Sequence, residues 1–155
     1  MAIKGGDKLR AALERIANTQ TIQVNAGILA GATNEDTGEP IAPYAAANEF
    51  GTKNIPPRPF MRSTIANKSN EWSQLLASQL HGRMQDGNIE AAFDVVGKEM
   101  ALDIKDSIEH SLPPPNAPET IARKRKKGIA EPEKTLVDTG SMQRAVDYEV
   151  IKGEK

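Results

Sequence analysis

The feature that most constrains this chain is a stretch at residues 54–59, here called the strap, in which three of six residues are proline. Each proline fixes its own φ angle and pushes the residue before it to an extended conformation. The strap should therefore be stiff and kinked, with few backbone donors. Residues 45–50 leave room for little more than one helical turn before it, and Gly51 suits the left-handed position that ends a helix. The strap is either a connection held in the core by Phe60 or a shape presented to a partner.

Length and charge limit what such a chain is expected to be. With 155 residues it has the size of one domain, and we treat 1–155 as a single unit. Its 20 basic residues nearly cancel 21 acidic ones, and a net charge of -1 gives no overall field to attract nucleic acid or an anionic membrane. Aromatic residues make up only 4%, so the core must be mainly aliphatic, which favours helices.

Two features that the sequence lacks, cysteine and long apolar segments, indicate where the protein is made. There is no cysteine, which excludes disulfides and a thiolate nucleophile and fits a reducing environment. No apolar run approaches the roughly 20 residues that span a bilayer, and the N-terminus has no secretory apolar region. We expect a protein that is made in the cytoplasm and has no membrane partner.

The periodicity of apolar residues predicts the elements of the first half. Asp7 suits the start of a helix with apolar positions at Leu9, Ala12, Leu13 and Ile16. Residues 22–28 alternate with the period of a strand that has one buried face. Residues 31–40 have the composition of an exposed loop or hairpin tip.

The second half predicts two long helices and a final strand. The first begins at Ser63 or Thr64 and has its apolar face at Ile65, Trp72, Leu75, Leu76 and Leu80. The next has apolar residues every three or four positions: Ile89, Phe93, Val96, Met100, Ile104, Ile108 and Leu112. Gly97 within it allows a neighbouring element to come close, and Val146, Tyr148 and Val150 alternate as in a strand. We predict an α+β fold in which a small antiparallel or mixed sheet packs against two long helices, with extended proline-rich loops.

A long connection at residues 113–135 contains five prolines and a basic cluster at 123–127. A connection of this length is usually functional or disordered, although Pro118 to Lys127 can form one or two helical turns if something holds them. The basic cluster is either a solvated loop or an arm that reaches an acidic neighbour or DNA. Without interleaved aromatic residues it is not expected to read sequence.

The segment Leu136-Val137-Asp138-Thr139-Gly140-Ser141 matches the aspartic-protease motif in residue type. That chemistry needs two aspartates that share a proton, which a homodimer would supply. Only 14 residues follow Ser141, however, too few for the rest of such a protease. The structural interpretation is that Asp138 and Thr139 bond locally to backbone groups and that Gly140 makes a turn. No phosphate loop or zinc spacing is present, and we assign no catalytic residue, cofactor or metal ligand.

Together the motifs resemble a family. The run Asn48-Glu49-Phe50-Gly51-Thr52, then Ile55-Pro56-Pro57-Arg58-Pro59-Phe60-Met61-Arg62, and the late Asp138-Thr139-Gly140 resemble tail-completion proteins of long-tailed bacteriophages, the lambdoid minor-tail-protein-Z-like and related head-tail joining proteins. The resemblance implies a virion subunit, assembled in the host cytoplasm, that forms a ring, usually hexameric, in the tail or neck. The ring completes or terminates the tail tube and joins it to the head connector, and it has no catalytic residues.

On this hypothesis the partners are further copies of the chain, tail tube protein and connector proteins. Passing genomic DNA is a further candidate, which would be bound without sequence specificity. We expect Arg58 to pair with a carboxylate at the ring interface. The full set of expected interface residues is Glu49, Phe50, Arg58, Phe60, Arg62, Arg123, Arg125 and Lys126. The alternatives are a DNA-binding accessory protein that uses residues 123–127 and, more remotely, a dimeric protease. The subunit number and the exact station in the virion stay open.

Overall fold

The computed structural model describes residues 7, 10–11, 21–83 and 87–153. Its elements, in chain order, are β1 (Ile22–Ile28), α2 (Ile41–Phe50), α3 (Phe60–Arg83), α4 (Glu90–Glu109), α5 (Pro118–Lys126), α6 (Ser141–Arg144) and β2 (Val146–Lys152). The predicted α+β fold with a small sheet is confirmed, and the sheet is a two-stranded antiparallel one. The helix predicted from Asp7 has all four of its apolar positions outside the described residues.

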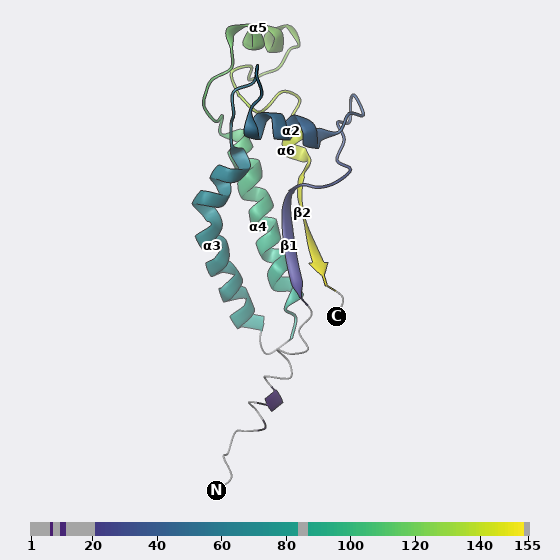
Figure 1. The fold of residues 1–155 in the computed structure, drawn as a ribbon, viewed down its shortest axis with the longest axis vertical. Coiled ribbons are helices and arrows are strands. Elements are labelled where there is room, and N and C mark those ends of the chain that lie inside the picture. The colour runs from purple at the N-terminus through teal and green to yellow at the C-terminus, as the bar shows by residue number, and fades with distance from the viewer. Residues whose placement is uncertain (1–6, 8–9, 12–20, 84–86, 154–155) are drawn as a thin grey trace.

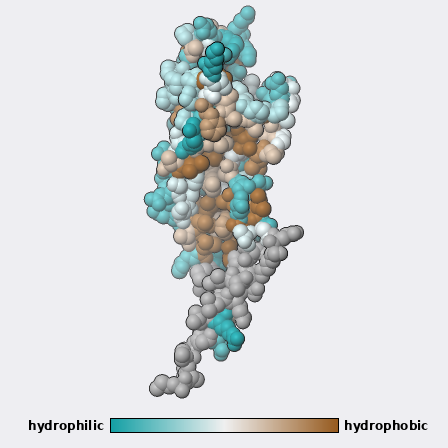
Figure 2. All heavy atoms as spheres, in the orientation of Figure 1, coloured by the Kyte–Doolittle hydropathy of each residue, from teal (hydrophilic) through white to brown (hydrophobic). Residues whose placement is uncertain are grey.

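Three layers lie side by side, with α4 between α3 and the sheet (Figure 1). The helices α3 and α4 run in opposite directions, and β1 pairs with β2 so that Ala26 lies opposite Tyr148 and Ile28 opposite Val146. Helices α2 and α6 lie at one end of these layers, and α5 lies beyond them. Figure 2 shows apolar residues along the middle of this face, whereas the end that carries α5 is mostly hydrophilic.

The packing of α4 on the sheet depends on Gly97. A Cβ atom at this position would lie 2.3 Å from Cδ2 of Tyr148 and 2.8 Å from Cγ2 of Val24, closer than packed carbon atoms approach. The close approach predicted for Gly97 is therefore confirmed. The hydroxyl of Tyr148 also donates to Asp94 Oδ1 at 2.7 Å, which fixes the ring across α4.

The start of α3 differs from the prediction. The helix begins at Phe60 instead of at Ser63 or Thr64, because its first backbone donors find a carboxylate elsewhere in the chain, described below. Of the apolar face predicted for α3, Trp72 is buried and donates to Asp103 Oδ2 of α4 at 2.7 Å, but Ile65 is 51% exposed. Contact with α4 covers only one side of α3, and Ile65 lies outside it.

Phe60 is fully buried and belongs to the same core cluster as Ile41, Leu136 and Met142. Phe60 therefore holds the end of the strap in the core, as expected if the strap is a connection anchored by this residue. The connection at 113–135 is not a plain loop, because α5 occupies Pro118–Lys126 within it. Proline at the first helical position suits this start, since its missing N–H would have no partner there.

Candidate functional site

The strap leaves α2 by a tight turn with a definite set of backbone bonds. Gly51 follows α2 with a φ of 78°, a conformation that favours glycine. The N–H of Thr52 then donates to the carbonyl of Ile55 at 2.8 Å, and the N–H of Arg58 donates back to the carbonyl of Asn48 at 2.7 Å. The strap therefore returns to the end of the helix that it left, which sets the position of Arg58 and Phe60.

The carboxylate of Glu49 ties the end of α2 to the start of α3. Its two oxygens accept the backbone N–H groups of Met61 and Arg62 at 2.9 and 3.0 Å. A carboxylate here satisfies free donors of the first turn and interacts favourably with the helix dipole. The guanidinium of Arg62 adds a bond from Nε to Glu49 Oε1 at 2.9 Å and one from Nη2 to the Glu49 carbonyl at 2.8 Å. Glu49 is buried and acts as a cap that no local sequence pattern identifies.

Phe50 points away from this buried junction. Its side chain is 65% exposed, and the guanidinium carbon of Arg62 lies 4.8 Å from the centre of its ring. This is a cation–π arrangement on the surface of the molecule. Glu49, Phe50 and Arg62, three of the residues expected at an interface, are thus brought together, and two of them are accessible.

Arg58 is bonded within the chain, and its expected pairing with a carboxylate at the ring interface stays a prediction. It is only 5% exposed, and its Nε and Nη2 donate to the carbonyls of Pro114 and Pro115 at 2.8 and 3.2 Å. Burial lowers the pKa of Arg58, although an arginine keeps its charge. Its partners in the described chain are carbonyls and not the carboxylate that we expected. Arg58 joins the strap to the second proline-rich segment.

That second segment is held by two more buried polar side chains. The amide of Asn116 donates to the carbonyls of Pro132 and Lys134 at 3.3 and 2.9 Å. The ammonium of Lys124 donates to the carbonyls of Lys134 and Val137 at 2.6 and 2.5 Å. Lys124 is 4% exposed, and burial lowers its pKa. Both side chains donate to carbonyls of an irregular segment, and these carbonyls have no hydrogen-bond partner in a helix or strand.

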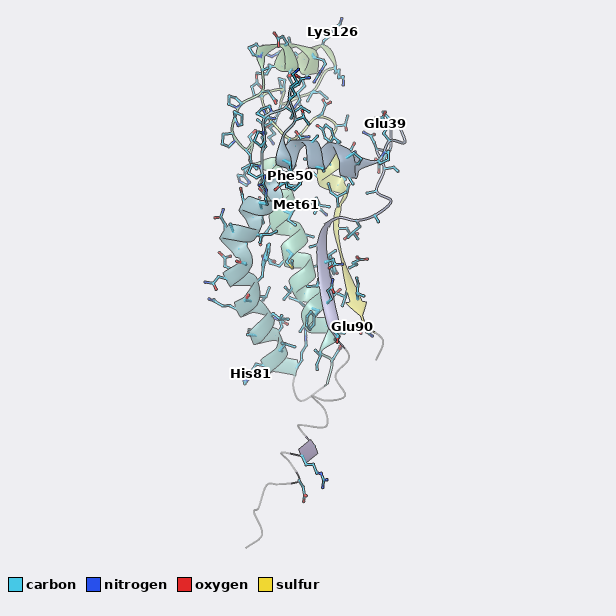
Figure 3. All side chains as sticks on the ribbon, viewed as in Figure 1. Glu39, Phe50, Met61, His81, Glu90 and Lys126 are labelled. Atoms are coloured by element: carbon cyan, nitrogen blue, oxygen red, sulfur yellow. The ribbon has the colours of Figure 1, made fainter. Side chains whose placement is uncertain are left out.

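The basic cluster at 123–127 is consequently not a free arm. Lys124 is buried, Arg125 Nη2 lies 2.6 Å from Glu133 Oε1, and Lys127 Nζ lies 3.5 Å from Asp138 Oδ2. Arg123 and Lys126 are exposed and make no bond within the described residues. The three expected interface residues on α5, Arg123, Arg125 and Lys126, lie apart from Phe50, as the labels in Figure 3 show for Lys126. Phe60, being fully buried, can only shape an interface.

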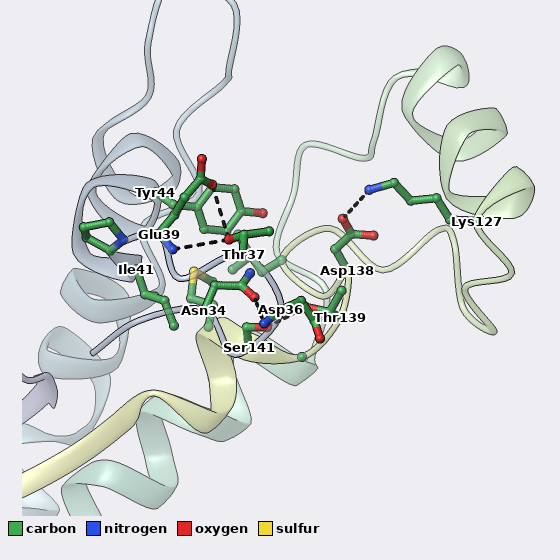
Figure 4. A pocket seen from close by; sticks show the side chains of 14 residues that line it. Asn34, Asp36, Thr37, Glu39, Ile41, Tyr44, Lys127, Asp138, Thr139 and Ser141 are labelled. Carbon is green, nitrogen blue, oxygen red and sulfur yellow. Dashed lines mark hydrogen bonds and ion pairs between the residues drawn. The ribbon is translucent and has the colours of Figure 1, made fainter. Parts of the chain in front are cut away.

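A pocket of about 400 Å³ opens between the loop before α2 and the Asp138–Ser141 turn (Figure 4). Its polar lining includes Asp36, Glu39, Tyr44, Lys127 and Asp138. Burial raises the pKa of the Tyr44 phenol, and the nearby carboxylate of Asp138 adds to that effect. Sequence reasoning treated residues 31–40 as a loop and found no pocket, because the other wall comes from about a hundred residues later in the chain.

The turn at Asp138-Thr139-Gly140 is partly as predicted. Gly140 has a φ of 79° and precedes α6, which confirms the turn. The predicted bonds from Asp138 and Thr139 to backbone groups are wrong, since Asp138 faces Lys127 and the Thr139 hydroxyl lies 2.6 Å from the Ser141 hydroxyl. The described residues contain no group of His, Cys, Asp or Glu suited to hold a metal ion.

No described helix is both long enough and apolar enough to cross a membrane. Comparisons of the chain with protein-family models, with curated proteins and with solved structures find no match. What the chain does must therefore be argued from its own residues and their arrangement.

Proposed function

We propose that this chain is a structural subunit of the virion of a long-tailed bacteriophage. On this proposal, copies of the chain form a ring, expected to be hexameric, in the tail or neck, assembled in the host cytoplasm. The ring completes or terminates the tail tube and joins it to the head connector. The proposal assigns the chain no catalytic residue and no cofactor.

One observation supports the proposal above others. The stretches that resemble the phage family lie far apart in the sequence, yet both are tied to the segment at residues 113–137, at one end of the molecule. Arg58 of the strap bonds to Pro114 and Pro115, and Lys124 bonds to Val137 beside the Asp138-Thr139-Gly140 turn. Residues that resemble one family and build one connected surface are what a shared binding role requires.

The rigidity of this end also supports a binding role. Prolines restrict the strap, and the buried side chains of Arg58, Asn116 and Lys124 bond to carbonyls of the second segment, so a partner meets a surface that is already ordered. Binding to an ordered surface costs less conformational entropy than binding to a mobile one. The exposed ring of Phe50 beside the Arg62 guanidinium is of the kind that anchors protein interfaces.

The experiment that tests the proposal is the mass of the purified protein in solution, alone and after addition of tail tube or connector protein. A ring, or a monomer that assembles when either protein is added, is the expected result. A protein that stays monomeric with both partners and instead binds duplex DNA would refute the joining role in favour of the DNA-binding alternative. Because Arg123 and Lys126 are the cluster's cations without a side-chain partner among the described residues, such DNA binding should have a shallow salt dependence, a slope of about -2 in log K against log salt.

A further inference from the structure

The two ends of α2 differ in charge and in position. Glu39, just before the helix, and Phe50, its last residue, mark these ends in Figure 3. The first end carries the pocket with Asp36, Glu39 and Asp138. The second end carries Phe50, Lys53 and Arg62, all exposed. One end therefore offers carboxylates and the other offers cations beside an aromatic ring.

The pocket has more hydrogen-bond acceptors than donors. Lys127 is its one cation, and it lies 3.5 Å from Asp138 Oδ2. The other oxygen of Asp138 is buried and accepts no hydrogen bond from the described residues. Glu39 receives only a long bond of 3.5 Å from the Thr37 hydroxyl, and the carboxylate of Asp36 has no donor in the described structure. Such a pocket is suited to a group that brings positive charge and N–H donors.

Its remaining wall suits the stem of such a group. Ile41, Leu136 and Met142 form the nearly buried apolar floor, and Tyr44, a residue that is 48% exposed, presents its aromatic ring. An arginine or lysine side chain has an aliphatic stem that packs on apolar surface and a cationic head that is attracted to carboxylates and to aromatic rings. A cationic side chain next to an aromatic one fits the combination of walls.

The opposite end of α2 presents these groups. Arg62 keeps more than half of its side chain exposed although it bonds to Glu49, and Lys53 makes no bond within the described residues. Between the two ends the solvent-facing side of α2 has no charged residue, only Ala42, Pro43, Tyr44 and Ala46 beside Phe50. An uncharged helix face of this kind is readily covered by a partner, because no charge must leave water.

We infer that the pocket takes the Phe50, Lys53 and Arg62 end of a second copy of this chain. The contact deepens the proposed ring, on which it rests, by naming the two surfaces that meet. The surfaces are different and lie at the two ends of α2, so the contact is heterologous, and each copy uses both. Repetition of such a contact produces a closed ring when the rotation between subunits closes.

Two double variants test the contact, each of which disables one surface. Asp36→Lys with Glu39→Lys reverses the pocket, and Phe50→Ala with Lys53→Ala removes the ring and the cation of the other end, while Arg62 is kept because it bonds to Glu49, the cap of α3. Each variant should be monomeric under conditions in which the wild type assembles, by native mass spectrometry. Glu99→Lys, which reverses an exposed carboxylate on α4, is the matched control and should assemble like the wild type.

The decisive measurement is a mixture of the two double variants. One retains an intact pocket and the other an intact Phe50 end, so they should form a 1:1 dimer and nothing larger. Three results would each overturn the contact. The first is absence of this dimer, and the second is assembly of either variant alone to wild-type size. The third is a wild type that is monomeric alone and with tail tube and connector proteins. If the variants join tail tube or connector protein as the wild type does, only the contact fails. If the wild type joins neither, the joining role itself fails.

Discussion

Glu49 at the end of α2 binds Arg62 at the start of α3 through both its side chain and its backbone carbonyl. The carboxylate thus receives a backbone donor and a guanidinium donor from one residue, with the N–H of Met61 as a third bond. Two helices separated by the strap are fixed to each other by this group. The same guanidinium covers the ring of Phe50, so the exposed aromatic group depends on the buried carboxylate for its support.

Glu49→Gln should therefore destabilise the protein, because the amide cannot accept all of these bonds and has no charge to match Arg62. Hydrogen bonds to a charged group suggest a loss of about 2–3 kcal/mol in the free energy of unfolding. Chemical denaturation measures it. The control is Glu90→Gln, which removes a carboxylate from an ion pair with Lys152 that is about half exposed, and which should cost about 0–1 kcal/mol. Equal effects of the two substitutions would contradict the capping role.

Arg58→Met should loosen both proline-rich segments in the monomer. The variant loses the donors to the carbonyls of Pro114 and Pro115, which leaves partly buried acceptors unpaired at a cost of about 1–3 kcal/mol. Limited proteolysis should then cut residues 113–137 faster than in the wild type. Lys53→Met, an exposed position next to the strap, is the control. From the sequence we expected Arg58→Ala to impair ring assembly more than folding, and wild-type stability of an Arg58 variant that fails to assemble would restore that expectation.

Lys124→Met tests the second buried cation. Carbonyls of Lys134 and Val137 lose their donor, and we expect a loss of about 2–3 kcal/mol in the free energy of unfolding. Lys126→Met changes an exposed lysine on the same helix and should stay within about 0.5 kcal/mol of the wild type. The comparison separates the burial of one lysine from the charge of the cluster. Two similar results would show that Lys124 is not a structural residue.

Gly97→Ala should disturb the contact between α4 and the sheet. The added methyl group would overlap Tyr148 and Val24, and overpacking of this kind costs about 1–3 kcal/mol. Gly82→Ala in α3 is the matched control, because nothing lies within 4 Å of its Cβ position and alanine favours a helix by up to about 1 kcal/mol. Thermal unfolding should move in opposite directions for the two variants.

Acid should weaken the ion pair between Glu109, at the end of α4, and Lys134, in the connection after α5. The hydrogen bond from Lys134 lowers the pKa of Glu109, so this carboxylate stabilises the folded state above its ordinary pKa. That contribution is lost as the pH falls through the lowered value. Glu109→Gln and Lys134→Met should each lose less stability than the wild type between pH 7 and acid, by denaturation midpoints at each pH. If both variants lose as much stability in acid as the wild type does, the bond between Glu109 and Lys134 does not contribute to the acid dependence.

The regular spacing of apolar residues in the sequence was enough to predict part of this fold. The spacing of apolar residues in α4 and the alternation in β1 and β2 repeat over many residues, so each pattern identifies its element. Gly97 could be identified because a glycine inside a strongly patterned helix has few other reasons to be there. The fold class followed from these elements together.

The candidate site could not be predicted in the same way, because its bonds join distant segments. The start of α3 depends on a carboxylate in another helix, and the partners of Arg58 are carbonyls 56 and 57 residues away, which any residue type provides. Lys124 stands among five consecutive basic residues, and nothing in the sequence singles it out for burial. Side chains that bond to backbone groups leave no pairing signal in a sequence.

The antiparallel pairing of β1 with β2 has a consequence for the order of folding. Ile22 lies opposite Lys152, so the sheet joins segments that are separated by nearly the whole described chain. During synthesis β1, α3 and α4 are complete while β2 is still to be made, and the side of α4 around Gly97 lacks Tyr148 until then. Such distant pairing is slow because a long loop must close first. A chain stalled before Val146 would present an unpaired strand and an open apolar face, the form most exposed to aggregation.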